Sequence, residues 1–393
     1  MLFSPLIILG ALALVLIASG LLEFRYHQLV LSSIPIRIHV NGTRGKSSVT
    51  RLIAAGLRAG GKRTFAKTTG TAPRVIDSKG IDRIIHRLRR PSIGEQVRLL
   101  KYFSSENPDV VVMECMAVQP QYQWISEHQM VKSHIGVITN ARPDHLDEMG
   151  PTEVDVVKSL CNSIPVGGTL VTAEDKHKDI LQSVADRNQS EIFFSDESSV
   201  SEKDLNNFAY IEHPQNVAIA LDVCHKMGVE RDIALSGMHS VRPDLGALVV
   251  WKLLGKQGSL QFVNGMAAND PVSTLQIWKF VIDRYPTTSG TAVFFNSRDD
   301  RPLRTKQMLE LTFEEIKPEY FIIRGDKIEA KVRRLLHHSP DTEVSIFSLN
   351  ESIDSVSESI LSLPDDVLVF AIGNQVGTGQ EILQKLSESR DND

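Results

Sequence analysis

The sequence predicts an α/β protein with two domains, preceded by an apolar helix. Residues 36–40 alternate apolar and polar side chains and lead through a glycine loop into a run with helical spacing. Apolar runs typical of buried parallel strands recur along the chain and alternate with helical patterns. The first 22 residues carry no charged side chain. A length of 393 residues suffices for two domains with sizeable cores.

The apolar segment, residues 1–22, is predicted to be a membrane anchor, because about 20 apolar residues can cross a bilayer as a helix. A cleavable signal peptide is the competing interpretation. It usually starts with basic residues, which are missing here, although Ala18-Ser19-Gly20 is small enough for cleavage. Arg25 and Arg37 follow the segment, so we expect a single N-terminal pass through the cell membrane with a cytoplasmic body.

Residues 41–50 are predicted to bind the phosphates of ATP. Strand, glycine loop, Gly-Lys-Ser and helix follow one another as in a phosphate-binding loop, here a shortened variant. The glycines let backbone N–H groups turn toward an anion, and the helix N-terminus adds partial positive charge. Lys46 can reach the β- and γ-phosphates, and the Ser47 hydroxyl can bind Mg²⁺. The residues assigned to the nucleotide are Gly42, Thr43, Arg44, Gly45, Lys46, Ser47 and Ser48. An ordinary glycine turn is the alternative.

Two further candidates follow apolar runs. Residues 110–114 end in the carboxylate of Glu114, and His145 follows a second run, residues 134–140. Ligands gather at the carboxyl ends of strands in open α/β sheets, so both residues are predicted to bind a metal beside Ser47. An ordinary strand-end acid and a structural loop histidine are the alternatives. Mg²⁺ prefers oxygen ligands, and the histidine leaves Mn²⁺ open as a second metal.

A Thr/Gly-rich loop, residues 68–71, and a charged run, residues 82–90, lie between these motifs. The loop could cradle a phosphate or a carboxylate. We expect Arg83, Arg87 and Arg90 of this run to fall on one helical face and to attract an anionic substrate, although a solvated face is the alternative. Arg89 and Arg74, which follows the Thr/Gly-rich loop, belong to the same predicted basic cluster, and His86 could add charge at lower pH. A net charge of −5 gives no argument for nucleic acid, and three cysteines without paired spacing argue against disulfides or a zinc site.

The rest of the chain predicts the end of one domain and a second one. Predicted helices at 152–162, 175–187 and from His213 to near Gly228 alternate with strands at 169–172 and 191–195. Residues 231–258 are predicted to be irregular and to hold the domain boundary. Strands near 260–264, 291–296, 319–323, 343–348 and 366–371 then indicate an α/β domain with a mostly parallel sheet. The predicted units are residues 1–22, 35–250 and 259–393.

With these motifs in view, the chain resembles the Mur-ligase-type ATP-dependent amide ligases, and more narrowly the ligase subunits of bacterial poly-γ-glutamate (capsule) synthases. The resemblance covers almost the whole chain and rests on the order and spacing of its motifs together. They are Asn41-Gly-Thr-Arg-Gly-Lys-Ser-Ser, Lys67-Thr-Thr-Gly-Thr, Ser92-Ile-Gly-Glu-Gln, Glu114-Cys-Met-Ala-Val, Asp144-His-Leu-Asp-Glu-Met-Gly-Pro-Thr, Pro214-Gln-Asn216, Pro243-Asp-Leu-Gly-Ala, Val263-Asn-Gly-Met-Ala-Ala-Asn-Asp and Asn296-Ser-Arg-Asp-Asp-Arg.

The resemblance implies a P-loop Mur-ligase-like central domain and a C-terminal Rossmann-like domain. It implies that ATP converts a carboxylate to an acyl phosphate, which an amine attacks, and that the product is glutamate joined through γ-carboxyls. It also implies membrane subunits of a synthase and export complex as partners. By the same resemblance, Asn216 contacts adenine, and domain closure brings Arg298 and Arg301 to the nucleotide or acyl phosphate. The implied catalytic residues are Lys46, Glu114, His145 and Arg298, and Asn264, Asn269 and Asp270 form a linker motif.

The sequence also departs from the Mur pattern. Lys158 and Leu160 stand near the place of a modified lysine, and an arginine expected after Pro-Gly is replaced by Ala247. The N-terminal nucleotide-sugar domain is missing, which argues against a UDP-linked substrate. Another Mur-like or folylpolyglutamate-like amino-acid ligase is one alternative function. A membrane P-loop ATPase that regulates assembly is another.

Overall fold

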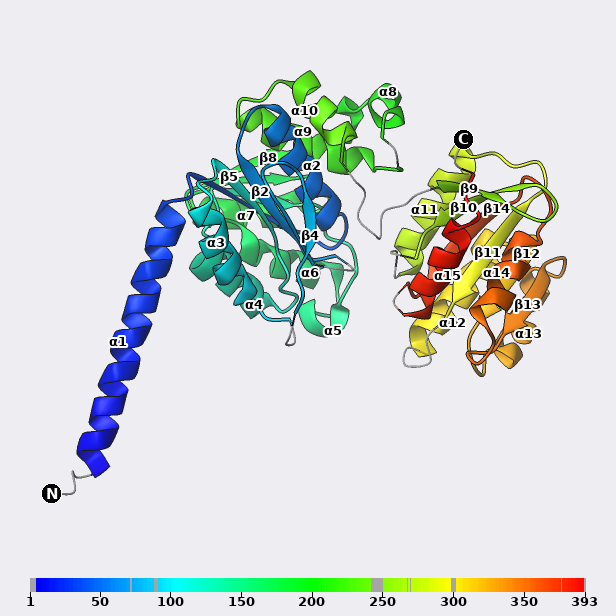
Figure 1. Cartoon of the computed structure of the whole chain (residues 1–393), viewed down its shortest axis with the longest axis horizontal. Coiled ribbons are helices and arrows are strands. Elements are labelled where there is room, and N and C mark those ends of the chain that lie inside the picture. The colour runs from blue at the N-terminus through cyan, green and yellow to red at the C-terminus, as the bar shows by residue number, and fades with distance from the viewer. Residues whose placement is uncertain are drawn as a thin grey trace. The chain divides into compact units, whose positions relative to one another are not determined.

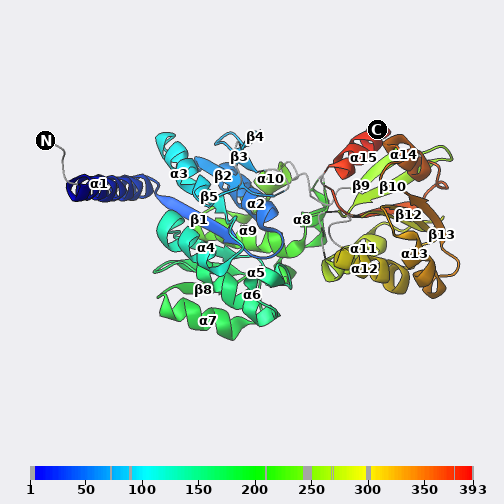
Figure 2. The ribbon, with the colours of Figure 1, turned by 90° about the horizontal axis from the view of Figure 1, so that it is seen from below.

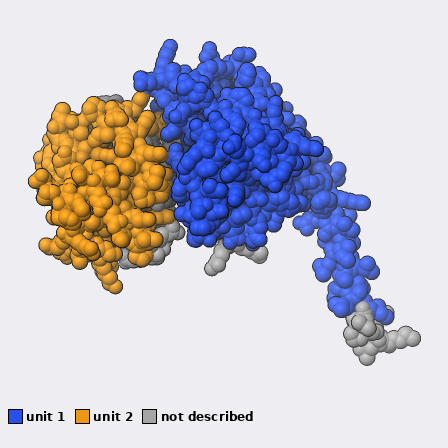
Figure 3. Space-filling view, turned by 180° about the vertical axis from the view of Figure 1, so that it is seen from behind, with its two compact units in different colours: residues 1–208, 213–242 blue, residues 209–212, 243–393 orange. Residues whose placement is uncertain are grey.

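The computed structural model describes residues 5–70, 73–87, 91–208, 210–241, 250–266, 268, 270–297, 302–375 and 377–391. The chain divides into two compact units (Figure 3). One comprises residues 1–208 and 213–242, and the other comprises residues 209–212 and 243–393. Each unit is built around its own mostly parallel sheet with helices packed against it (Figure 1).

The first unit begins with one continuous helix, α1 (Pro5–Ser32). Residues 7–26 are exposed, and the helix is long and apolar enough to cross a membrane. The predicted end at residue 22 lies inside α1, because no glycine or proline stands between residue 22 and Pro35. Only the last turns pack on the unit, where Val30, Leu31 and Ile34 join a buried cluster.

The sheet of the first unit has eight strands in the order β4-β3-β2-β5-β1-β6-β7-β8. The inner strands are parallel, and β3 and β4 form an antiparallel edge. Because β1 lies in the middle of the sheet, between β5 and β6, the loop that follows it opens at the middle of the carboxyl edge. The strands are β1 (Ile36–Asn41), β2 (Thr64–Thr68), β3 (Arg74–Ile76), β4 (Asp82–Ile84), β5 (Val110–Glu114), β6 (Ile135–Ile138), β7 (Thr169–Thr172) and β8 (Glu191–Phe194).

Helices cover both faces of this sheet (Figure 2). The connection from β1 to β2 moves along the sheet in the direction opposite to that of the later connections. Because such crossovers are right-handed, α2 (Lys46–Ala59) lies on one face of the sheet and the later crossover helices lie on the other. Packed on α2 are α9 (Pro214–Lys226) and α10 (Arg231–His239). The other face carries α3 (Glu95–Ser105), α4 (Pro120–Ile125), η1 (Ser126–Val131), α6 (Glu153–Leu160) and α7 (Lys178–Arg187). Shorter elements are α5 (Leu146–Met149), η2 (Cys161–Ser163), η3 (Glu197–Ser199) and α8 (Glu202–Asn206).

Two predictions about this unit are wrong. The charged run does not form a helix: residues 82–84 are strand β4, paired with β3 across a turn in which Asp77 Oδ1 accepts two backbone hydrogen bonds. Arg89 and Arg90 lie outside the described residues. The described parts of residues 231–258 are not irregular throughout, because α10 buries Ala234, Leu235 and Met238 at helical spacing and residues 250–254 form a strand.

The second unit has a six-stranded sheet in the order β13-β12-β11-β14-β10-β9. All five strands predicted there are present, and the unpredicted β9 pairs antiparallel with β10 at one edge. The strands are β9 (Val250–Leu254), β10 (Ser259–Asn264), β11 (Thr291–Asn296), β12 (Tyr320–Arg324), β13 (Glu343–Phe347) and β14 (Leu368–Gly373).

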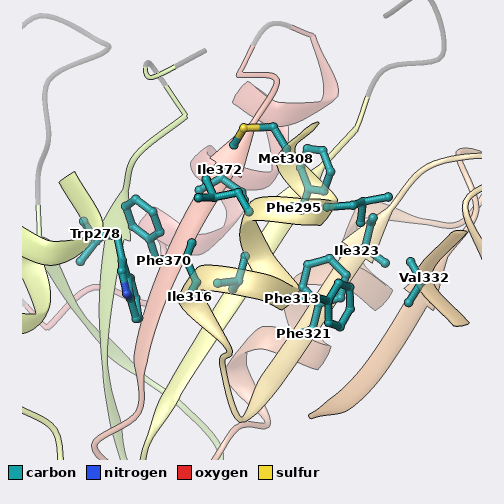
Figure 4. Close-up of a cluster of buried hydrophobic side chains, with 14 of the residues drawn as sticks. Trp278, Phe295, Met308, Phe313, Ile316, Phe321, Ile323, Val332, Phe370 and Ile372 are labelled. Atoms are coloured by element: carbon teal, nitrogen blue, oxygen red, sulfur yellow. The ribbon is translucent and has the colours of Figure 1, made fainter. Parts of the chain in front are cut away.

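Aromatic side chains fill one layer of the second core, where Trp278 packs against Phe370 and Phe313 packs against Phe321 (Figure 4). The helices are α11 (Pro271–Arg284), α12 (Pro302–Leu311), η4 (Thr312–Ile316), α13 (Glu329–Leu335), η5 (Leu336–His338), α14 (Ile353–Leu361) and α15 (Thr378–Ser387).

Candidate active site

The loop between β1 and α2 requires glycine at two positions. Gly42 has a φ of 130°, and a Cβ there would lie 2.0 Å from Thr139 Oγ1. Gly45 has a φ of 80°, and a Cβ there would lie 2.5 Å from Asn216 Oδ1. Both positions therefore combine a left-handed backbone with a close approach, which only glycine tolerates.

Residues after β6 hold this loop in place. Asn140 Oδ1 accepts hydrogen bonds from Thr43 Oγ1 at 2.7 Å and from the Arg44 backbone N–H at 3.2 Å. Thr139 Oγ1 donates to the Arg44 carbonyl at 2.5 Å. Sequence reasoning missed Asn140, although its place directly after an apolar strand at the carboxyl edge was a usable signal.

Glu114, which is 2 % exposed, ends β5 beside the loop and the start of α2. It accepts a hydrogen bond from Ser47 Oγ at 2.8 Å and from the Thr69 backbone N–H at 2.6 Å. The Thr69 hydroxyl donates to its other oxygen. Thr69 of the Thr/Gly-rich loop thus binds a carboxylate of the protein itself.

Lys46 folds back over the glycine loop. Its Nζ donates to the carbonyls of Gly42 at 2.6 Å and Thr43 at 3.3 Å. Burial lowers the pKa of this lysine, and the nearby Glu114 carboxylate opposes that shift. A pocket of about 250 Å³ opens in front of the amine. Its lining includes Gly42, Thr43, Lys46, Thr69, Arg87, Cys115 and His145.

His145 reaches the same pocket from the loop after β6. Its side chain is 53 % exposed, and its backbone is left-handed with a φ of 49°. Its Nε2 lies 3.9 Å from Asp144 Oδ2, which also faces Arg44 Nη2 at 3.5 Å. Among the described residues, no three histidine, cysteine or acidic side chains form a cluster that could hold a metal alone. A cation here would therefore need the Ser47 hydroxyl and ligands from outside the protein.

A chain of charged side chains backs one wall of the pocket. Arg87 donates to both oxygens of Glu95, from Nε at 2.7 Å and Nη2 at 2.9 Å. Lys67, which is fully buried at the end of β2, has its Nζ 3.6 Å from Glu95. Burial alone would raise the pKa of Glu95, but the Arg87 hydrogen bonds and the Lys67 charge hold it below its usual value. Burial lowers the pKa of Lys67.

The remaining predicted residues have different outcomes. Asn216, which is 8 % exposed, lies in the first turn of α9 with its amide against Gly45. Ser48 lies in the first turn of α2. Arg298, Arg301 and Asn269 lie outside the described residues, and so does the Pro243 motif. The network of Glu95 and Lys67 was not predicted, because its members come from separate elements and share no sequence spacing.

Comparisons with known proteins match both halves of the chain. Residues 40–251 match the Mur ligase middle domain, and residues 250–389 match the poly-gamma-glutamate synthase CapB C-terminal domain. The capsule biosynthesis protein CapB of Bacillus anthracis is 34% identical over 99% of this chain and 84% of its own length. The PGA synthase CapB of Bacillus subtilis is 32% identical over 95% of this chain and 96% of its own length.

Solved structures agree on the fold. E. coli FolC, in complex with DHPP and ADP, superposes with a TM-score of 0.67 at 15% identity and covers 92% of this chain and 91% of its own. A bifunctional folylpolyglutamate synthase/dihydrofolate synthase with Mn, AMPPNP and L-glutamate bound gives 0.65 at 14% identity and covers 92% of each chain. The Mur ligase domain indicates an ATP-dependent amide ligase. The two family models and the near full-length relatives together place this chain in the CapB family of Mur-type ligases.

Proposed function

We propose that this chain makes poly-γ-glutamate by activating a γ-carboxylate as an acyl phosphate and adding glutamate to it. The observation that carries the proposal is the meeting of Lys46, Ser47 and Glu114 at the carboxyl edge of β1, beside a pocket large enough for the reacting groups. The substrate carboxylate attacks the γ-phosphorus and ADP leaves. The amine of the incoming glutamate then attacks the acyl carbon, and inorganic phosphate leaves as the amide forms.

Phosphoryl transfer depends on positioning and charge neutralisation, and the loop supplies both. The turn at Gly42 and Gly45 leads into the N-terminus of α2, whose first backbone N–H groups have no helical partner and can bind the phosphates. Lys46 exchanges its two carbonyl acceptors for phosphate oxygens, which carry more negative charge. We propose that Asn216 contacts the adenine and that Arg298 and Arg301 of the second unit join the nucleotide.

A hydroxyl, a carboxylate and an imidazole fit a divalent cation that keeps several waters. Mg²⁺ or Mn²⁺ held by Ser47, Glu114 and His145 would neutralise charge on the transferred phosphoryl group. Thr69 fixes the carboxylate of Glu114 with two hydrogen bonds and so keeps it aimed at Ser47. The three side chains come from the start of α2, the end of β5 and the loop after β6.

Arg87 is our candidate for holding a substrate carboxylate. It lines the pocket, and Glu95 uses only its Nε and Nη2, which leaves N–H groups for an anion. Its bidentate pairing fixes the plane of the guanidinium, and buried Lys67 in turn holds Glu95. The charged run thus contributes one positioned arginine to the pocket.

We also propose that α1 anchors the protein in the cell membrane by a single pass with a cytoplasmic body. The exposure of residues 7–26 supports this, because an apolar surface of that size is unfavourable in water. The anchor of residues 1–22 would then precede a ligase domain of residues 35–250 and a second domain of residues 259–393. Its partners would be membrane subunits of a synthase and export complex. We propose no nucleic-acid partner.

The linkage and identity of the product test this function. Membranes containing the chain, ATP, Mg²⁺ and radiolabelled glutamate should yield a polymer whose amide bonds run through γ-carboxyls. The FolC-like fold favours a second candidate, a ligase that adds glutamate to a small non-polymeric acceptor. A labelled product of only one added residue on such an acceptor would support that candidate and contradict polymer synthesis.

A further inference from the structure

A second cavity of the first unit lies away from the phosphate loop. It encloses about 610 Å³ between α2, the β3–β4 turn and α10. Three cations line it together with two serine hydroxyls and one carboxylate. These residues are Arg51, Arg58, Lys79, Ser78, Ser240 and Asp82. The cavity is therefore concave, polar and rich in positive charge.

The carboxylates near this cavity already have partners. Asp82 Oδ2 lies 2.8 Å from Arg51 Nη1 and 3.5 Å from Arg74 Nη1. Asp77, on the turn beside the cavity, accepts two backbone hydrogen bonds through Oδ1, and its Oδ2 lies 3.6 Å from Arg83 Nη2. The two carboxylates therefore already lie beside three arginines, Arg51, Arg74 and Arg83. Arg58 and Lys79 add two more positive charges to this region.

Arg58 is a partly buried cation with little compensation. Within the described part of the chain, its one hydrogen bond is a 3.5 Å contact from Nη1 to the Thr64 carbonyl, although a guanidinium offers five N–H groups. Burial lowers its pKa to about 10, with Asp77 opposing and Arg51 adding to that shift. Its guanidinium faces Gly80, where even an added Cβ would stay 3.6 Å from Nε. A bound anion would satisfy this charge.

We propose that this cavity binds carboxylates of the γ-glutamyl chain at a distance from the bonds being made. The inference rests on the proposed function, since that function supplies the polyanion. Arg58 and Lys46 stand near opposite ends of α2, so the helical rise separates their Cα atoms by about 18 Å. A single bound glutamate cannot span that distance, whereas a chain of several residues can. The cavity therefore acts on long acceptors and not on monomeric glutamate.

Direct binding tests this without catalysis. Fluorescently labelled poly-γ-glutamate is titrated with the full chain in detergent micelles, without ATP. Arg58→Gln should raise the Kd about tenfold, because a charge-assisted hydrogen bond is lost. Exposed Lys79→Gln should raise it by a smaller factor, about twofold. Arg98→Gln, which removes an exposed charge from α3 on the other face of the sheet, should leave it unchanged. An unchanged Kd in Arg58→Gln with a normal melting temperature would overturn the proposal.

Two further arms separate the possible ligands. Inorganic phosphate at millimolar concentration should not displace the polymer, and full displacement that is lost in Arg58→Gln would mean a site for a small oxyanion instead. In amide-forming assays, Arg58→Gln should keep the wild-type rate on a one-residue acceptor and lose rate on long ones. If neither the wild type nor any variant forms amide bonds, while Arg58→Gln still weakens polymer binding, the result contradicts the proposed ligase function and supports the binding site. Normal amide formation on every acceptor would overturn the site alone.

Discussion

At the scale of single residues, the site depends on carboxylates that are held by specific donors. Glu114 is fixed by Ser47 and Thr69, and Glu95 by Arg87 and Lys67. A buried carboxylate is stable only when such partners compensate its lost hydration. The pairs therefore keep charged groups ready beside the phosphate loop.

The Glu95 network predicts a specific dependence of stability on pH. Because the folded pKa of Glu95 lies below its ordinary value, its contribution is fully present above that ordinary value, near pH 4.5, and is lost as pH falls through the folded pKa. Glu95→Gln should lose about 3 kcal/mol at pH 7, since it leaves Lys67 and Arg87 unpaired. The free energy of unfolding, measured from pH 7 to pH 3, should fall less steeply with acid in the variant than in the wild type. Parallel curves would contradict this account of Glu95.

The sequence allowed part of this site to be predicted. Gly42 to Ser48 follow a recognisable local pattern, and Glu114 could be placed because it ends an apolar strand. Asn140 and Thr69 could not be paired with their partners, since Thr43 lies 97 positions from Asn140 and Glu114 lies 45 from Thr69. Such contacts depend on which strands become neighbours, and local spacing does not carry that information.

At the scale of elements, α1 and β1 are joined without a flexible linker. Arg37, near the start of β1, is buried and donates to the carbonyls of Leu31 at 2.6 Å and Ile34 at 2.8 Å, as well as to Val131 at 2.9 Å. It thus satisfies carbonyls at the end of α1 that have no helical partner. The foot of α1 consequently belongs to the folded body, while its exposed part does not.

Two truncations should separate these parts of α1. Removing residues 1–22 should release a soluble protein that still binds ATP, with polymer synthesis reduced. Removing residues 1–34 should also remove Val30, Leu31 and Ile34 from the core. Each contributes about 1.5–3 kcal/mol, so their summed loss is comparable to the whole stability of a domain. Alkaline extraction and thermal unfolding report the two effects. A 1–22 truncation that stays in the membrane fraction would contradict the anchor.

Element prediction succeeded for strands and failed where the pattern was short or mixed. The parallel strands were found because buried runs such as residues 110–113 are continuously apolar. Strand β4 was mistaken for part of a helix because it has only three residues, too few to reveal a period of two. Strand β9 was missed because it was read as part of a boundary.

At the scale of the whole molecule, each unit matches a family model, and the chain is an ATP-dependent ligase of Mur type. A ligase differs from a regulatory ATPase in one respect that can be counted. It releases one phosphate for each amide bond formed, because the phosphate leaves only when an amine attacks the acyl phosphate. The ratio of these two products therefore tests the coupling between ATP hydrolysis and bond formation.

The most direct test measures phosphate and amide formation together in wild type, Lys46→Ala and Lys203→Ala. We expect a ratio near one in the wild type and in Lys203→Ala, which changes an exposed lysine of α8. Lys46→Ala should remain folded and lose both products by at least about a hundredfold, since it removes the cation that meets the transferred phosphate. Arginine at position 46 should not restore them, because a planar fork does not replace a compact ammonium. Phosphate release without amide in the wild type, or normal polymer from Lys46→Ala, would contradict the ligase mechanism.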